Sequence, residues 1–255
     1  MRTAKEILCF VETLAPRDYM MDWDNCGLLV GDPEQPVEKV LVALDPFEDV
    51  CLEAVEGGYQ LILTHHPLLF SPARTVTTET SVGRCLRLLV KNDIAAINAH
   101  TNLDCADGGV NDTLAEVLGL QNVEVADSEV PHLLRCGTVE ETELADFLKL
   151  VKEKLGCPGL RYAGNRKVHK VCVGGGACGD MFRDAFAAGC DTFVTSDVKY
   201  NQFWDARDLG MNIIDAGHFY TESPVCDALA HKLREAFPEL LVEVSKIHRD
   251  CTNFF

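Results

Sequence analysis

Three short motifs in the chain combine histidines and carboxylates in a way that could bind metal ions. The residues are His65 and His66, His100 and Asp104, and His218 and Glu222. Imidazole nitrogens together with carboxylate oxygens are typical ligands of zinc, iron, manganese, cobalt or nickel. The sequence therefore predicts a metal centre with mixed nitrogen and oxygen ligands, and it leaves the identity of the metal open.

The spacing within the motifs leaves several ways to arrange the ligands. The adjacent His65 and His66 point in different directions on an extended backbone, so they serve two ions, or one ion if a turn intervenes. Glu222 lies four residues after His218, so both side chains share one face if a helix begins here. A carboxylate of this kind can bridge two cations roughly 3.5–4 Å apart. His100 is either a ligand or a residue that orients Asp104 or transfers a proton.

Each motif directly follows an apolar segment that predicts a β-strand. These segments are Leu61–Thr64, Ile94–Ala99 and Asn212–Ala216. Helical patterns alternate with the strands, which indicates βαβ units and mainly parallel sheets flanked by helices. Ligands of such folds bind outside the carboxyl ends of the strands, which is where the histidines and carboxylates lie.

The second half of the chain repeats the first. A shift of 131 positions places Lys39 on Lys170 and Thr64 on Thr195, and a shift of 117 places Ile97 on Ile214. We expect an α/β protein of two similar, interlocked domains that arose by internal duplication. The predicted division is 1–127 and 128–255, with the option that the last strand, 240–244, returns to the first domain.

Composition narrows the functional class. The formal net charge of −17 disfavours a broad nucleic-acid interface, because an acidic surface repels phosphates. The 12 cysteines are scattered singly and form no Cys-x-x-Cys pair, which is typical of free thiols in a reducing compartment. The start of the chain predicts an amphipathic helix and not a signal peptide. We expect a cytoplasmic protein without a membrane span.

For three further segments the sequence allows both a structural role and a role at the site. Gly174-Gly175-Gly176 could approach a phosphate, but it lacks a dinucleotide fingerprint and is mainly expected to form a tight turn. Asp24–Gly31 is either a structural turn with a strand or a lining of the site. In the second repeat, Ser196-Asp197 occupies the position of His65-His66, and Asp197 and Lys199 are candidates for lining the cleft.

Taken in order, the motifs resemble those of the Nif-three-like dinuclear-metal proteins, the GTP cyclohydrolase 1 type 2 homologues. The resemblance covers essentially the whole chain. It rests on four segments of this sequence: DNCGLLVG from Asp24, THHPL from Thr64, AHTNLD from Ala99 and GHFYTE from Gly217.

The resemblance implies two divalent metal ions held by His65, His66, Asp104, His218 and Glu222, with Glu222 touching both ions. It also implies a toroidal homohexamer and the compact form of the family, without an inserted domain. The expected function is a metal-dependent hydrolase or cyclohydrolase acting on a GTP-like nucleotide or another phosphorylated metabolite. A metal chaperone, metal-insertion factor or regulatory binding protein is the alternative.

Overall fold

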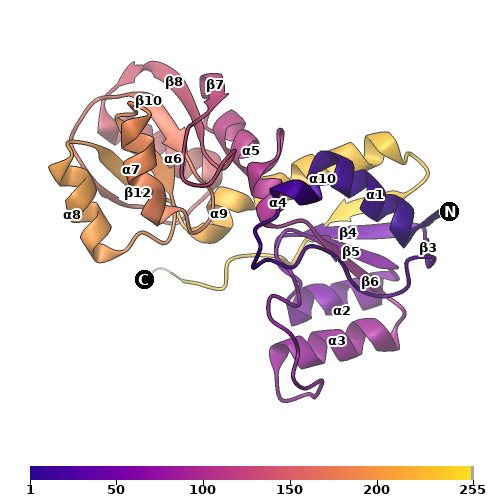
Figure 1. Cartoon of the computed structure of the whole chain (residues 1–255). Helices are drawn as coiled ribbons and strands as arrows, with labels where there is room; N and C mark the ends of the chain where they lie inside the picture. Colours follow the sequence, from indigo (N-terminus) through magenta and orange to yellow (C-terminus); the bar gives the residue numbers. More distant parts are fainter. Residues whose placement is uncertain (254–255) are drawn as a thin grey trace. The chain divides into compact units, whose positions relative to one another are not determined.

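The computed structural model describes residues 1–253, which divide into two compact units (Figure 1). The first unit consists of Met1–Leu103 and Cys226–Arg249, and the second consists of Asp104–Val225 and the residues from Asp250 onward. Each unit is built on its own β-sheet with helices packed against it. The predicted α/β architecture is therefore confirmed.

The sheet of the first unit has the strand order β13-β4-β5-β6-β2. The strands β13 (Leu241–Val244), β4 (Lys39–Ala43), β5 (Leu61–Thr64) and β6 (Ala95–Asn98) are parallel, and β2 (Gly27–Val30) is antiparallel to β6. Helices α2 (Glu48–Gly57) and α3 (Ser81–Lys91) cover one face, whereas α1 (Ala4–Leu14) and α10 (Pro224–Ala236) lie on the other (Figure 1). Two short strands, β1 (Arg2–Thr3) and β3 (Pro36–Val37), pair with each other. The 3-10 turn η1 (Arg17–Tyr19) lies between them in the sequence.

Local sequence explains the limits of these helices. Thr3 and Glu6 form a capping box at the start of α1, which satisfies two backbone amides that have no partner within the helix. Gly58 ends α2 in the left-handed conformation that glycine adopts without steric cost. All four residues of β5 are buried, as expected for a central parallel strand covered on both faces.

The sheet of the second unit has the order β7-β8-β10-β11-β12-β9. Its centre is parallel and consists of β10 (Val168–Val173), β11 (Thr192–Thr195) and β12 (Asn212–Asp215). Antiparallel strands complete it: β7 (Gln121–Val125), β8 (Arg135–Thr142) and β9 (Arg161–Ala163).

Helices pack on both faces of this second sheet. The apolar side chains of α5 (Val110–Val117) and α6 (Leu144–Leu155) form one core, and those of α7 (Phe182–Ala187) and α8 (Tyr200–Asp208) form another. The remaining elements are α4 (Thr101–Cys105), η2 (Gly179–Met181) and α9 (His218–Glu222).

The internal repeat is visible in the positions of the strands. A shift of 131 residues carries β5 onto β11, and a shift of 117 residues carries β6 onto β12. In both sheets the equivalent strands are neighbours and parallel. The two units therefore share a βαβ core of the same order.

The division between the units differs from the predicted limit at residue 127. It falls between Leu103 and Asp104, within α4, because α5 packs on the second sheet and β7 pairs with β8. The chain returns to the first unit at Cys226, and β13 pairs in parallel with β4. The segment whose destination the sequence left open is thus an edge strand of the first sheet.

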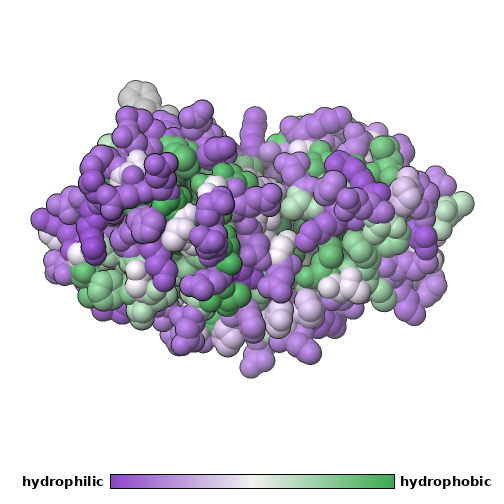
Figure 2. All heavy atoms as spheres, turned by 90° about the horizontal axis from the view of Figure 1, so that it is seen from above, coloured by the Kyte–Doolittle hydropathy of each residue, from purple (hydrophilic) through white to green (hydrophobic). Residues whose placement is uncertain are grey.

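One face of the protein's surface is largely hydrophilic. Hydrophilic residues cover most of the face drawn in Figure 2, with smaller hydrophobic areas between them. Among the described residues, we find no helix with the length and apolar character needed to cross a bilayer.

Candidate metal centre

The ends of parallel strands deliver the predicted ligands. His65 and His66 directly follow β5, and His100 follows β6 after one residue. His218 begins α9 and follows β12 after two residues. The first three residues belong to the first unit, whereas Asp104, His218 and Glu222 belong to the second.

In the first unit, three imidazole rings converge to form what we call the histidine cluster: His65, His66 and His100. One nitrogen of each ring lies within 4.8 Å of a nitrogen of the other two. The centroid of the His65 ring is 4.8 Å from that of His66 and 5.2 Å from that of His100. His65 is fully buried. Such an arrangement suits a cation that accepts nitrogen ligands.

Hydrogen bonds fix the tautomer of each ring in the histidine cluster. Nδ1 of His65 lies 2.9 Å from the carbonyl oxygen of Ala99. Nδ1 of His66 lies 2.7 Å from Oδ1 of Asp45, and Nδ1 of His100 lies 2.8 Å from Oδ1 of Asp24. Because carbonyl and carboxylate oxygens accept hydrogen bonds, each Nδ1 carries the hydrogen and donates it. The lone pair of each neutral ring is then on Nε2, which is the pattern found around metal-bound histidines.

Asp24 is held by several donors besides His100. Its carboxylate accepts hydrogen bonds from the amide and the hydroxyl of Thr101, and its side chain is fully buried. Burial by itself would raise the pKa of Asp24, but the bonds from His100 and Thr101 outweigh burial and lower this pKa below its ordinary value. Asp24 is therefore a carboxylate that orients His100. The strand expected within the segment from Asp24 to Gly31 is present as β2, so one end of this segment contacts the histidine cluster and the rest is structural.

Asp45 has the same relation to His66. Its other oxygen, Oδ2, lies 3.5 Å from Nε2 of His248. Burial raises the pKa of Asp45, but the hydrogen bonds with His248 and His66 have the larger combined effect and lower it. His248, which the sequence did not select as a ligand, thus contacts the carboxylate that supports His66.

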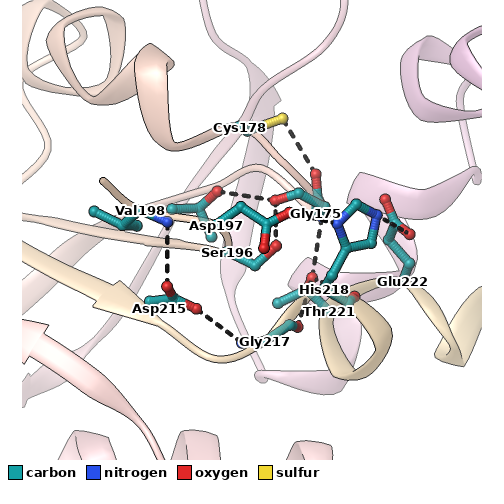
Figure 3. A network of polar contacts seen from close by, with 12 residues as sticks. Gly175, Cys178, Ser196, Asp197, Val198, Asp215, Gly217, His218, Thr221 and Glu222 are labelled. Atoms are coloured by element: carbon teal, nitrogen blue, oxygen red, sulfur yellow. Dashed lines mark hydrogen bonds and ion pairs between the residues drawn. The ribbon is translucent and has the colours of Figure 1, made fainter. Parts of the chain in front are cut away.

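In the second unit, Asp104, His218 and Glu222 form what we call the carboxylate cluster. Nε2 of His218 is 3.0 Å from Oε2 of Glu222, and the imidazole lies beside the Glu222 carboxylate in Figure 3. A carboxylate oxygen of Asp104 lies within 4.8 Å of one of Glu222. Nδ1 of His218 is 2.7 Å from Oδ2 of Asp197, so this histidine also donates through Nδ1. Asp197, a candidate for lining the cleft, thus contacts His218.

The short helix α9 explains why His218 and Glu222 meet. The two residues are its first and last, and a spacing of four places side chains on one helical face. Asp215 anchors the entry to the helix, because its carboxylate accepts the amide hydrogen of Gly217 at 3.1 Å (Figure 3). The helix on which the shared face of His218 and Glu222 depends is present and begins at His218.

The glycine run does more than form a tight turn. The amide of Gly175 donates to Oδ1 of Asn111 at 2.7 Å, and that of Gly176 donates to the hydroxyl of Thr221 at 3.0 Å. A Cβ atom added at Gly176 would lie 2.0 Å from Oε1 of Glu222. Glycine at this position therefore leaves the space that the Glu222 carboxylate occupies, a role that the turn pattern in the sequence did not reveal.

Two exposed aromatic rings lie next to the histidine cluster. Trp23 and Phe70 are 62% and 55% exposed, and their ring centroids are 5.7 Å apart. The His100 ring lies 6.2 Å from Trp23 and 6.1 Å from Phe70, edge-on to both. Large rings exposed beside polar ligands are typical of surfaces that bind another planar ring. Sequence reasoning missed both residues, and it also missed Asp45, whose position after β4 was an available signal.

The fold and the site define the class: a two-unit α/β protein with histidines and carboxylates at the ends of its strands. Residues 2–251 match the family model described as Duf34/NIF3 (NGG1p interacting factor 3). The chain belongs to this family.

Relatives of known sequence and structure agree with this assignment. Two proteins named "GTP cyclohydrolase 1 type 2 homolog" are similar to the chain. The one from Clostridium perfringens is 41% identical, with 90% of each chain covered, and the one from Streptomyces coelicolor is 36% identical, with 96% of this chain and 92% of the relative covered. A Bacillus cereus protein related to NIF3 superposes over 100% of this chain and 99% of its own, with a TM-score of 0.93 and 28% identity. Reduced HcgD from Methanocaldococcus jannaschii superposes over 96% and 98%, with a TM-score of 0.83 and 30% identity.

Proposed function

We propose that the protein binds two divalent metal ions through His65, His66, Asp104, His218 and Glu222 and acts as a metal-dependent hydrolase or cyclohydrolase. The observation that carries this proposal is the shared tautomer of the histidines. Each of His65, His66 and His218 donates its Nδ1 hydrogen to an oxygen acceptor, so Nε2 is the nitrogen that would bind a cation.

The donor set fits zinc, iron, manganese, cobalt or nickel, because it mixes imidazole nitrogen with carboxylate oxygen. When bound, such ions would supply Lewis acidity and make a coordinated water a nucleophile near neutral pH. His100 would hold or transfer a proton at Nε2, since Asp24 fixes the hydrogen on Nδ1. The buried carboxylate of Glu222 would contribute negative charge that balances the cations.

The proposed substrate is a nucleotide or another phosphorylated metabolite. The exposed rings of Trp23 and Phe70 support a substrate with a planar base, because they offer aromatic faces next to His100. The name of the relatives from Clostridium perfringens and Streptomyces coelicolor is consistent with a GTP-like compound.

A metal analysis followed by an activity screen tests the proposal. We expect protein purified without added metal to contain divalent metal, and the loaded protein to convert at least one nucleotide or phosphorylated metabolite. Glu222→Gln and His65→Ala should abolish turnover. The control is His231→Ala: His231 forms a similar His–Glu pair with Glu235, at 3.3 Å and four residues apart, on the exposed face of α10.

Two outcomes would contradict parts of the proposal. A chain that neither contains nor takes up divalent metal would overturn the metal centre itself. Metal bound through these ligands and passed to an apo-protein, without turnover of any compound, would instead favour the chaperone or insertion function.

We also propose that the protein forms a toroidal homohexamer in the cytoplasm. Support for a reducing compartment comes from the 12 cysteines, which form no disulfide within the residues that the structure describes. Light scattering coupled to gel filtration should give six times the mass of one chain, 28.1 kDa. A monomer or dimer at micromolar concentration would refute the hexamer.

A further inference from the structure

Another group of potential ligands lies in the core of the second unit, apart from the carboxylate cluster. Cys136 on β8, Cys172 on β10 and Cys190 in the turn before β11 are buried among the apolar side chains of α7 and α8. The three sulfur atoms lie within 4.8 Å of one another, and those of Cys136 and Cys190 are 3.2 Å apart. We call these three residues the thiol cluster.

The topology of the sheet fixes the position of the three sulfurs. Cys136 and Cys172 are directly opposite each other in the antiparallel pair β8 and β10, so their side chains point to the same face. Cys190 reaches that face from the turn after α7, where its amide donates to the carbonyl of Ala185 at 3.1 Å. Strand pairing and the backbone bond of Cys190 thus hold the three sulfurs together.

A pocket of about 260 Å³ leads to the thiol cluster. Cys136 lines it, together with the edge strand β7 and the end of α7. Its other lining residues are Glu124, Val125, Ala126, Asp127, Ala187 and Ala188. The two carboxylates at this opening favour the approach of a cation. The apolar remainder favours an ion that sheds its water easily, as soft cations with sulfur ligands do.

The charge state of the sulfurs is suited to binding a cation. Hydrogen bonds from the thiols of Cys172 and Cys190 lower the pKa of Cys136, and the positive charge of Lys170 acts in the same direction. Burial raises the pKa of Cys172. One thiolate is therefore stabilised within a group of neutral thiols, and thiolate is the form of cysteine that binds metals.

We propose that the thiol cluster binds one soft monovalent d10 cation, Cu(I), per chain. The group offers three sulfurs and no nitrogen or oxygen ligand, and such a set selects soft ions. Structural zinc sites are almost always four-coordinate, so a three-sulfur site suits zinc less well. Binding would release thiol protons to solvent. The site is independent of the histidine and carboxylate clusters and of the reaction proposed for them.

The test is an anaerobic titration of the full chain with Cu(I) against a competing Cu(I) chelator. We expect one ion per chain, with sulfur ligands alone in the X-ray absorption spectrum. Cys136→Ala should weaken this binding at least 100-fold. Cys157→Ala, which removes a buried thiol of the same unit outside the cluster, should leave binding unchanged. His65→Ala should also retain the ion, which separates this result from any failure of the divalent centre.

A second pair of variants leaves every thiol in place. Glu124→Gln and Asp127→Asn together should slow uptake of Cu(I) several-fold at low salt without changing the number of ions bound. Unchanged uptake would overturn the proposed entry route. Binding by Cys136→Ala equal to that of the parent, nitrogen or oxygen ligands in the spectrum, or a Cys136–Cys190 disulfide in protein isolated anaerobically would each overturn the site.

Discussion

The carboxylate of Asp45 accepts the Nδ1 hydrogen of His66 at 2.7 Å, so the orientation of a proposed ligand depends on a residue that follows the neighbouring strand. Carboxylates in this position fix the ring and raise its basicity, and their loss typically weakens metal binding 10- to 100-fold. We expect that loss for Asp45→Asn, measured by competition with a divalent-metal chelator. Asp49→Asn, which removes the same charge at an exposed position of α2, should bind metal like the parent. Equal affinities of the two variants would contradict the role of Asp45.

Gly176 allows a direct test of how closely the backbone approaches Glu222. Gly176 and Gly156 both have φ of 65°, so an alanine at either position carries a similar backbone strain of about 1 kcal/mol. Only at Gly176 would the new Cβ meet Glu222, since nothing lies within 4 Å of a Cβ at Gly156. Thermal unfolding should show a larger destabilisation for Gly176→Ala than for Gly156→Ala, because only Gly176→Ala adds a clash with Glu222 to the backbone strain. Metal analysis should show loss of metal from Gly176→Ala alone, and retention of full occupancy would argue against the role given to Glu222.

The exposed ring of Trp23 is expected to act on substrate and not on metal. Trp23→Ala should raise KM for a base-containing substrate about 10-fold, the effect of losing one stacking contact of roughly 1 kcal/mol or slightly more. The content of divalent metal should not change. Trp204→Ala removes the other tryptophan, which is 49% exposed on α8, and serves as the control. A decrease in kcat with KM unchanged would contradict a binding role for Trp23.

A pH-dependent contact joins β13 to the first sheet. The hydroxyl of Tyr59 donates to Oε2 of Glu243 at 2.5 Å, and this bond is the main cause of the lowered pKa of Glu243. The contribution of this bond to the free energy of unfolding is therefore complete above the pKa of Glu243 in the unfolded chain, about 4.3. It is lost as the pH falls through the lower pKa of Glu243 in the folded protein.

Removal of the Tyr59 hydroxyl should reveal this contribution. We expect Tyr59→Phe to be less stable than the parent by about 1 kcal/mol at neutral pH, with the difference shrinking below about pH 4. Urea unfolding at several pH values provides the measurement. Tyr162→Phe, a change at an exposed ring on β9, should have little effect at any pH. A stability difference between Tyr59→Phe and the parent that grows as the pH falls would contradict this pH dependence.

Much of the fold follows from local patterns in the sequence. The segment predicted at 61–64 coincides with β5, and the one predicted at 212–216 contains β12 and extends one residue beyond it, because buried parallel strands are rich in apolar residues. His218 and Glu222 could be paired from their spacing, since a helix of one turn is enough to bring them together. Local periodicity thus accounts for the strands and for the ligands at their ends.

Residues that depend on contacts across the sheet were harder to predict. Asp45 meets His66 only because β4 and β5 are neighbours, and Trp23 meets Phe70 through chain folding that no local pattern encodes. The role of Gly176 requires its positive φ and its proximity to a side chain 46 residues later, neither of which a glycine run reveals. The division between the units lies at Leu103 and not at residue 127, because α5 packs on the second sheet and β7 pairs with β8.

That pairing has a consequence for the newly made chain on the ribosome. The buried strand β4 has no partner at one edge until β13 emerges about 200 residues later, long after β5 and β6 are available. The second unit, which is almost continuous in sequence, can be complete before then. Until β13 leaves the ribosome, the first unit carries an apolar strand with an open edge, a form prone to aggregation that nascent-chain chaperones bind.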